Sequence, residues 1–549
     1  MSTRKYLAQV FAVVILAVLL CGLSVWKDGK GTADEAEEFV WFSSISFWNP
    51  PEWSLAEDTV TGQISQRTGV SFTYDIPQKN AGMQLGQMLI KNELPDVISI
   101  SDVAMQKQLA ESGKVWDIQE LLEQYDPDSL ILKQFPQDVK AILEDAEGGW
   151  YCYPSHIGSA DMREVYPPCD PYYWDLVYYQ SNEGIMFNRA IMERLGLTAE
   201  ELQTEEQVQE AFRMVKKLGE QTGQELTPLL LNGQKYEISS LPALSKSFGA
   251  KWIDGDGSYR DYYFSEQARQ ALAFINTAYR NGCLKAEQLS YSVEEMQKQL
   301  QSGNVFCFIG NLADTGVDER GWEGAAILSS LGDVPAVQVS AQAQVWLHTY
   351  ISKSCPHPEK IAKWLSFMAG EEGMMLNYFG IEGRDYIMQD GFPVRTKAGM
   401  EGQNSMENGL WIFWPFANTT WEKHAALPPE EDSRQAAAHR VQTAMGRYPQ
   451  SELYEVALTV NLNSDLEEKS GYGELLNSVQ EYKNSQLLSV ITAESQEQFE
   501  AEYGKLIQGL KDMGLVKLDK ELNKCYQERC RRYGITLEDN YKETMPKDR

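Results

Sequence analysis

Short apolar runs alternate with amphipathic helical segments along the chain, and this alternation most restricts the fold. Residues 97–100 form a short apolar run, followed by a helical stretch around Met105. Residues 305–309 form another such run, directly after a helix whose capping box is Ser292 and Glu295. Strands that alternate with helices of this length build sheets with helices on their faces. The sequence therefore predicts an α/β protein.

The chain is too long for a single hydrophobic core. It has 549 residues, whereas single cores stop growing at roughly 250–300 residues. Hydrophobic residues make up 43% of the chain and aromatic residues 11%, which is enough to fill packed interiors. Two lobes, each with its own core, are therefore expected.

The net charge argues against one class of partner. The 49 basic and 79 acidic residues give a formal charge of −30. A nucleic-acid-binding face needs clustered Lys and Arg to neutralise phosphates, so no nucleic acid partner is expected. Acidity of this size is typical of a protein that stays soluble outside the cell.

The N-terminus has the layout of an export signal. Arg4 and Lys5 form a short basic region, and residues 10–20 are an unbroken apolar run that ends directly before Cys21. The layout resembles a bacterial lipoprotein signal, in which the cysteine is lipidated, although the preceding residue is Leu20 where a small residue is usual. The alternative is an uncleaved anchor.

Both alternatives place the protein at the outer face of the cytoplasmic membrane. Residues 1–26 are therefore interpreted as a signal peptide or membrane anchor, and 27–38, rich in Gly, Asp, Glu and Ala, as a solvated linker.

The distribution of chemically reactive residues does not indicate an enzyme or a metal site. Seven cysteines besides Cys21 are widely spread, and five histidines occur singly, without zinc-ligand spacing. No G-x-S-x-G elbow, P-loop or H-E-x-x-H motif is present. We therefore expect no catalytic residue, cofactor or metal.

Several segments together resemble the family 1 extracellular solute-binding proteins of ABC importers, especially their larger lipoprotein branch. The matches run in the family order from about residue 40 to about residue 530. The segments that carry the resemblance are 94–98 (LPDVI), 148–154 (GGWYCYP), 184–197 (GIMFNRAIMERLGL), 300–305 (LQSGNV) and 378–386 (YFGIEGRDY).

This resemblance implies a two-lobed, periplasmic-binding-protein-like fold of type II, with mixed sheets, flanking helices and an interlobe cleft that holds the ligand. By analogy, residues 39–157 and 342–386 form the first lobe, and 158–341 and 387–549 form the second. The implied ligand is a carbohydrate, the implied partners are ABC permease subunits, and the implied state is a monomer.

A site for such a ligand needs aromatic faces for the C–H faces of a sugar and polar groups for its hydroxyls. Aromatic candidates come from clusters and from the end of the first strand, and polar candidates follow other strands. The predicted ligand-binding residues are Phe47, Trp48, Ser101, Asp102, Trp150, Tyr151, Tyr178, Asn311, Trp411 and Trp414. Each aromatic residue could instead pack in a core, Asp102 could cap a helix, and Asn311 could shape a turn.

Two other functions remain open from the sequence. One is a peptide- or sensor-coupled binding lipoprotein that signals instead of feeding a permease. The other is a secreted glycoside hydrolase, for which the abundant carboxylates are no specific indication.

Overall fold

The structure is a computed structural model. It describes residues 36–174, 181–254, 257–327, 338–339, 346–405, 409–446, 450–451, 466 and 472–533. Cys21, Tyr178 and the predicted anchor lie outside these residues.

The chain forms two compact units. Unit 1 contains Met1–Tyr166 and Val345–Ala426, and unit 2 contains Pro167–Gln344 and Leu427–Arg549. The predicted boundaries assigned 387–426 to the second lobe, whereas the structure assigns these residues to unit 1.

The physical reason is a shared core. Ile412, Phe413 and Phe416 are buried in the same hydrophobic cluster as Trp41 and Trp364. The rings of Trp41 and Phe413 stack with centroids 6.2 Å apart, so residues 409–416 complete the interior of unit 1.

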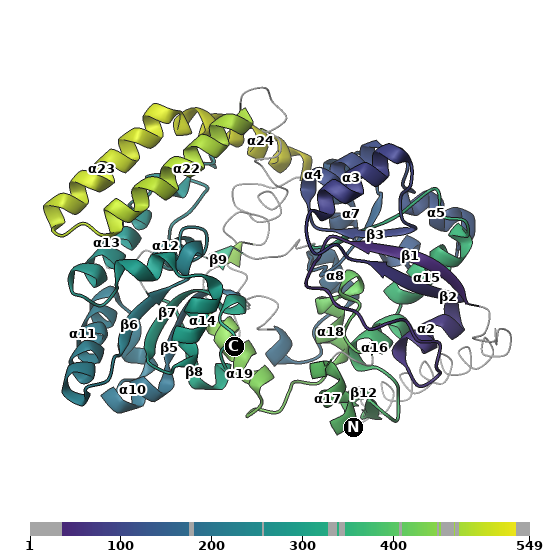
Figure 1. Ribbon diagram of the computed structural model, residues 1–549, viewed down its shortest axis with the longest axis horizontal. Helices are drawn as coiled ribbons and strands as arrows, with labels where there is room; N and C mark the ends of the chain where they lie inside the picture. Colours follow the sequence, from purple (N-terminus) through teal and green to yellow (C-terminus); the bar gives the residue numbers. More distant parts are fainter. Residues whose placement is uncertain are drawn as a thin grey trace, which may run out of the picture. The chain divides into compact units, whose positions relative to one another are not determined.

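Unit 1 is built on a mixed five-stranded sheet in the order β2-β1-β3-β10-β4 (Figure 1). β1 pairs in parallel with β2 and β3, whereas β10 is antiparallel to β3 and β4. The strands are β1 (Glu37–Ser43), β2 (Val70–Asp75), β3 (Val97–Ile100), β10 (His348–Ile351) and β4 (Cys152–Pro154). All four residues of β3 are buried, as expected from the apolar run at 97–100.

The helices of unit 1 follow the alternating pattern expected from the sequence. They are α2 (Val60–Thr68), α3 (Ala81–Lys91), α4 (Val103–Glu111), α5 (Ile118–Tyr125), α6 (Leu130–Gln134), α7 (Gln137–Glu147), α8 (Ala160–Val165), α15 (Pro358–Ala369), α16 (Glu371–Phe379), α17 (Lys397–Ser405) and α18 (Thr419–Ala425). A separate hairpin is formed by β11 (Tyr386–Gln389) and β12 (Phe392–Arg395).

Unit 2 is built on a four-stranded sheet in the order β6-β7-β5-β8. β6 and β7 are parallel, and β5 is antiparallel to both β7 and β8. The strands are β6 (Thr227–Leu231), β7 (Val305–Asn311), β5 (Glu183–Asn188) and β8 (Trp322–Ala325), and a separate short pair is β9 (Gln338–Val339) with β13 (Gln450–Ser451).

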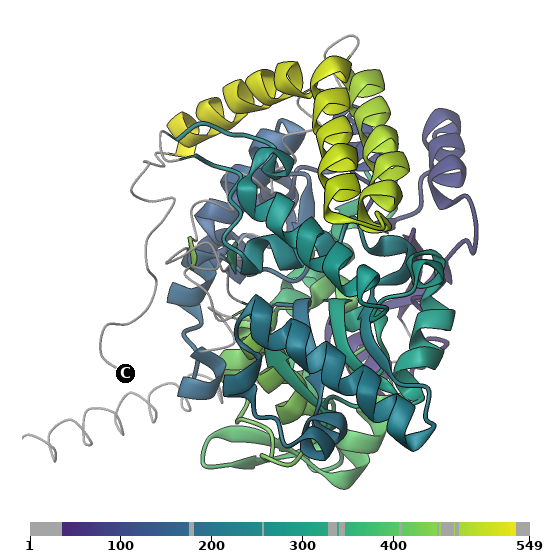
Figure 2. The ribbon, with the colours of Figure 1, turned by 90° about the vertical axis from the view of Figure 1, so that its left-hand side faces the viewer.

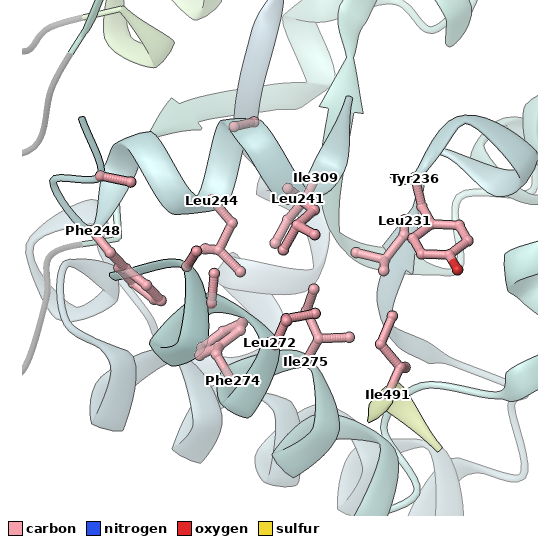
Figure 3. Close-up of a cluster of buried hydrophobic side chains, with 14 of the residues drawn as sticks. Leu231, Tyr236, Leu241, Leu244, Phe248, Leu272, Phe274, Ile275, Ile309 and Ile491 are labelled. Carbon is pink, nitrogen blue, oxygen red and sulfur yellow. The ribbon is translucent and has the colours of Figure 1, made fainter. Parts of the chain in front are cut away.

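The core of unit 2 lies between its sheet and its helices. Figure 3 shows Leu241 and Leu244 of α12 close to Leu272 and Ile275 of α13. The helices are α10 (Arg189–Leu195), α11 (Glu205–Thr222), α12 (Ser240–Ser247), α13 (Glu266–Arg280), α14 (Val293–Gln301), α19 (Arg434–Met445), α22 (Tyr472–Ile491), α23 (Gln496–Met513) and α24 (Leu515–Tyr533).

The last three of these helices complete the unit. Figure 2 shows α22 and α23 side by side, and buried residues of both belong to the same cluster as α13. Ile491 of α22 and Phe499 and Leu506 of α23 are fully buried in it.

Two α-helices of unit 2 begin with capping boxes, including the predicted one of Ser292 and Glu295. Thr204 accepts a hydrogen bond from the backbone N–H of Gln207 at the start of α11, and the Gln207 side chain accepts one from the Thr204 N–H. Ser292 and Glu295 make the same reciprocal contacts at the start of α14. These helices therefore begin where local sequence directs them.

Candidate functional site

The loops of unit 1 that carry exposed aromatic residues meet at one edge of its sheet. β1 and β3 end at this edge, and the antiparallel register places the start of β10 and the end of β4 there as well, since His348 lies opposite both Ile100 and Pro154. The carboxyl ends of parallel strands are where ligands bind in open α/β sheets.

Three aromatic side chains form an accessible platform at this edge, made of Phe47, Trp346 and Trp414. The ring centroids of Phe47 and Trp346 are 6.3 Å apart and the ring planes differ by 11°. Trp414 lies 5.9 Å from Phe47 and 6.3 Å from Trp346. Phe47 is 67% exposed and Trp346 is 36% exposed. The platform can therefore offer aromatic faces to a ligand.

Buried neighbours fix the loops that carry the platform. Trp48 is only 2% exposed, and its indole N–H donates a hydrogen bond to the carbonyl of Ile412, 2.8 Å away. This bond links the loop of Phe47 to the segment of Trp414, whose own indole N–H donates to the carbonyl of Trp411. Trp346 is held by its backbone N–H, which donates to the carbonyl of Ser155.

His156 borders the platform and is an uncharged neighbour. Its ring lies edge-on to Trp346, with centroids 5.2 Å apart, and its Nδ1 lies 2.8 Å from the hydroxyl oxygen of Ser155. Burial lowers the pKa of His156 to about 4. The ring is therefore neutral at the pH of most natural environments.

A small crevice with three polar residues in its lining lies at the same edge. Its volume is about 240 Å³, and its lining includes Ser44, Ser101 and Asp102. The Ser101 N–H donates to the Ser44 hydroxyl over 3.4 Å, and Asp102 caps α4 by accepting a bond from the N–H of Met105. Asp102 is exposed, so it can both cap the helix and receive a ligand hydroxyl.

Polar side chains gather at the corresponding edge of unit 2, where β6 and β7 end. The Asn232 amide nitrogen donates to Asp314 over 3.0 Å, and Lys235 forms an ion pair with the same carboxylate at 2.9 Å. The amide oxygen of Asn232 is buried and has no hydrogen-bond partner among the described residues. Asn311 is half-buried, and its side chain accepts a bond from the N–H of Ala313.

A larger cavity, of about 770 Å³, lies elsewhere in unit 2, beside the edge strand β8. Five of its fourteen lining residues are alanine, and its one aromatic side chain is Tyr172, whose hydroxyl bonds His439. A cavity lined in this way offers less for a sugar ring than the platform does, despite its larger volume.

The structure places the predicted site residues in different environments. Phe47, Trp414, Ser101 and Asp102 lie together at the edge of unit 1, and Asn311 lies at the edge of unit 2. Trp48 and Trp150 are core residues, 2% and 3% exposed. Tyr151 and Trp411 are half-buried, and the Trp411 indole N–H is buried. Tyr178 lies outside the described residues.

Sequence reasoning missed two residues of this edge, Trp346 and His156. Trp346 precedes the short strand β10, and His156 follows β4, which forms the end of the GGWYCYP segment. The signal was present, because both residues flank apolar strand-like runs, but only the pairing of β4 with β10 brings them together.

A family model matches most of the first two thirds of the chain. The sequence model described as bacterial extracellular solute-binding protein matches residues 62–375, more than half of the 549. The chain belongs to this family. It is thus a solute-binding protein, of a family that acts outside the cytoplasm. No curated protein sequence matches it significantly.

Solved structures of solute-binding proteins share its fold over about nine-tenths of the chain. An HMO-binding, ABC-transporter-associated solute-binding protein from Bifidobacterium longum infantis has a TM-score of 0.64 at 13% identity, covering 90% of this chain and 99% of that one. The N-glycan transport solute-binding protein of Streptococcus pneumoniae has a TM-score of 0.58 at 15% identity, covering 90% and 99%.

A third structure is the S. pneumoniae ABC-transporter substrate-binding protein FusA in complex with kestose. Its TM-score is 0.58 at 13% identity, and the match covers 90% of this solute-binding protein and 100% of FusA. At such low identities, these structural matches show the fold alone. They confirm the predicted two-lobed α/β architecture.

The described part of this solute-binding protein contains no helix that is long and apolar enough to cross a membrane. The predicted signal or anchor at 1–26 lies outside that part.

Proposed function

We propose that this protein captures a neutral carbohydrate, of the size of an oligosaccharide, and delivers it to the permease of an ABC importer. The observation that carries the proposal is the accessible platform of Phe47, Trp346 and Trp414 at the carboxyl edge of the unit 1 sheet. Family membership and the sugar-binding proteins that share the fold support it.

The chemistry of the platform matches that of a sugar ring. A pyranose presents apolar C–H groups on its faces and hydroxyls around its rim, so it needs flat aromatic surfaces and polar groups that hydrogen-bond hydroxyls. The platform supplies the surfaces. Ser101, Asp102 and Ser44 supply hydroxyl and carboxylate oxygens at the same edge.

In the proposed mechanism, unit 2 supplies the remaining polar contacts, and the ligand closes the two units around it. Asn232 and Asn311 are the unit 2 residues that we propose for this role. A ligand favours the closed form only through its stronger binding to that form, and the permease would recognise the closed form. No bond of the ligand is broken, so the protein acts as a binder and not as an enzyme.

The protein would work as a monomer tethered at the cell surface. We propose that the segment 1–26 supplies the tether, either through lipidation of Cys21 or as an uncleaved anchor.

A ligand screen followed by one set of variants tests the function. Isothermal titration of the purified protein with neutral oligosaccharides should give saturable binding by at least one of them, with the sugar recovered unchanged by chromatography. Phe47→Ala should weaken that binding about tenfold, because a stacking face is lost. Conversion of the sugar to product, or equal affinity in the variant, contradicts the proposal.

Ile90→Ala is the matched control. Ile90 is also a large apolar residue of unit 1, 84% exposed, but it lies near the end of α3 and does not contact the platform. It should leave the affinity unchanged.

A further inference from the structure

A cluster of metal-ligand side chains is buried in unit 1, on the face of the sheet formed by β4 and β10. Cys152 opens β4 and lies directly opposite Tyr350 of β10 in the antiparallel register. Opposed residues of an antiparallel pair project to the same face, and so do residues two apart on one strand. Cys152, Tyr350 and His348 therefore project together.

Glu147 completes the cluster from a helix. It is the last residue of α7, and its side chain reaches the face that carries the other three. His348 Nδ1 lies 2.8 Å from Glu147 Oε1, the Tyr350 hydroxyl donates to the same oxygen over 2.6 Å, and Cys152 Sγ lies 3.6 Å from it. One carboxylate oxygen thus receives all the short contacts.

The other carboxylate oxygen is left unpaired. Glu147 is only 7% exposed, and among the described residues no donor reaches its Oε2. A buried carboxylate oxygen without a donor costs free energy, because water no longer solvates it. A cation bound to this carboxylate would bring a positive charge next to the unpaired oxygen and offset this cost.

We propose that Glu147, Cys152 and His348 bind a divalent transition-metal ion of the zinc type, with Tyr350 or water as the fourth ligand. One ligand atom from each of the three residues lies within 4.8 Å of the others. Thiolate, imidazole and carboxylate are the ligands of Zn²⁺ in proteins. This site was not indicated by spacing along the sequence, because His348 is 201 residues from Glu147.

The distances suit a tetrahedral ion. Zn–ligand bonds of about 2.0–2.3 Å place neighbouring ligand atoms roughly 3.3–3.6 Å apart. The separation of Cys152 Sγ and Glu147 Oε1, 3.6 Å, and that of Tyr350 Oη and His348 Nδ1, 3.4 Å, already fall near this range. The 2.8 Å contact of His348 with Glu147 must lengthen, and so must the 2.6 Å contact of Tyr350 with Glu147 if Tyr350 is the fourth ligand.

Binding would convert the Cys152 thiol to a thiolate and release its proton to solvent. The chain leaves unit 1 after Tyr166 and returns at Val345. The ion would therefore link the segment of Glu147 and Cys152, before this departure, to the segment of His348, after the return. His348 is two residues from Trp346, so the ion would also fix the strand that directly follows this part of the platform.

Titration of the chelator-treated, full-length protein tests the site. With Zn²⁺, calorimetry should show one equivalent bound, together with a rise in the thermal midpoint that grows with the free metal concentration. With Co²⁺, a thiolate-to-metal charge-transfer band should appear in the near ultraviolet. Absence of this band in the wild-type protein overturns the proposal by itself, whether or not any variant folds.

Variants assign the ligands. Cys152→Ser should abolish the charge-transfer band, and His348→Gln should weaken Zn²⁺ binding at least about tenfold. The matched control is His357→Gln, which removes an exposed histidine of the same unit that contacts Glu37 and Glu359. His357→Gln should keep both the band and the affinity. A band that persists in Cys152→Ser, or is lost in His357→Gln, places the metal elsewhere and contradicts the proposal.

Discussion

Two neighbouring aromatic side chains have different environments, and their environments decide their roles. Phe47 and Trp48 are adjacent in the chain, yet Phe47 is 67% exposed and Trp48 is 2% exposed. Trp48 anchors the loop through its hydrogen bond to Ile412, and this anchor holds Phe47 at the surface. An exposed ring held by a buried one is pre-organised for stacking, because less conformational entropy is lost on binding.

Trp346→Ala should weaken carbohydrate binding by about 1–2 kcal/mol, which corresponds to roughly a tenfold rise in Kd. The ring is partly exposed, so its removal should change the thermal midpoint little. Calorimetric titration and a melting curve measure the two effects separately. A large loss of stability with unchanged affinity would show that Trp346 is a structural residue.

Carbohydrate affinity should be constant between pH 5.5 and pH 8. The only histidine that borders the platform among the described residues is His156, and burial lowers its pKa to about 4, so it stays neutral throughout this interval. Binding measured at several pH values checks this. A tenfold loss of affinity near pH 6 would mean that His156 gains a proton there.

At the scale of elements, close backbone approaches decide how helices dock on the sheets. α19 packs against β8 so closely that a Cβ at Gly324 would lie 2.3 Å from the carbonyl oxygen of Val441. α24 docks through Leu518 and Tyr526, which are buried in the core of unit 2, and through a polar contact. The Asp261 N–H donates to Asp519 of α24, and Lys483 of α22 pairs with the Asp261 carboxylate at 2.6 Å.

Gly324→Ala should destabilise unit 2 by about 1–3 kcal/mol, because the new methyl group meets backbone that cannot move without shifting α19. Gly321→Ala is the control, since a Cβ at Gly321 meets nothing within 4 Å. Thermal unfolding compares the two variants. Equal midpoints would show that α19 can move away from β8 at little cost.

The stability of unit 2 should fall as the pH rises from about 4 to about 7. Burial, and then the neighbouring Asp261 charge, raise the pKa of Asp519 to about 7 from its ordinary value of 3.8. The folded state therefore retains a proton that the unfolded state has lost, and this contribution disappears as the pH passes through 7.

Asp519→Asn should reduce this pH dependence and raise stability at pH 8 by about 1–3 kcal/mol, because no buried charge then forms. Asp512→Asn, an exposed change on the neighbouring helix α23, should have no such effect. Melting curves at pH 5 and pH 8 measure both variants. A pH profile that Asp519→Asn leaves unaltered would show that Asp519 is ionised in the folded protein.

At the scale of the whole molecule, unit 2 interrupts unit 1 in the sequence. Unit 1 resumes at Val345 and continues to Ala426, so the chain passes between the units three times. In the proposed function, residues at these crossings would supply the hinge.

Saturating carbohydrate should lower the radius of gyration measured by small-angle X-ray scattering, because we propose that the ligand stabilises a closed form. The Phe47→Ala/Trp346→Ala double variant at the same sugar concentration should scatter like the free protein. A ligand that binds tightly without any change in scattering would argue against closure.

The sequence by itself determined the α/β class, the need for two lobes, the capped starts of α11 and α14 and the buried strand β3, since these depend on local periodicity, length and caps. Tertiary structure alone decided which aromatic residues are exposed. It also decided that 387–426 belong to unit 1 and that His348 lies beside Cys152. Exposure and proximity depend on contacts between residues hundreds of positions apart, and no local pattern records such contacts.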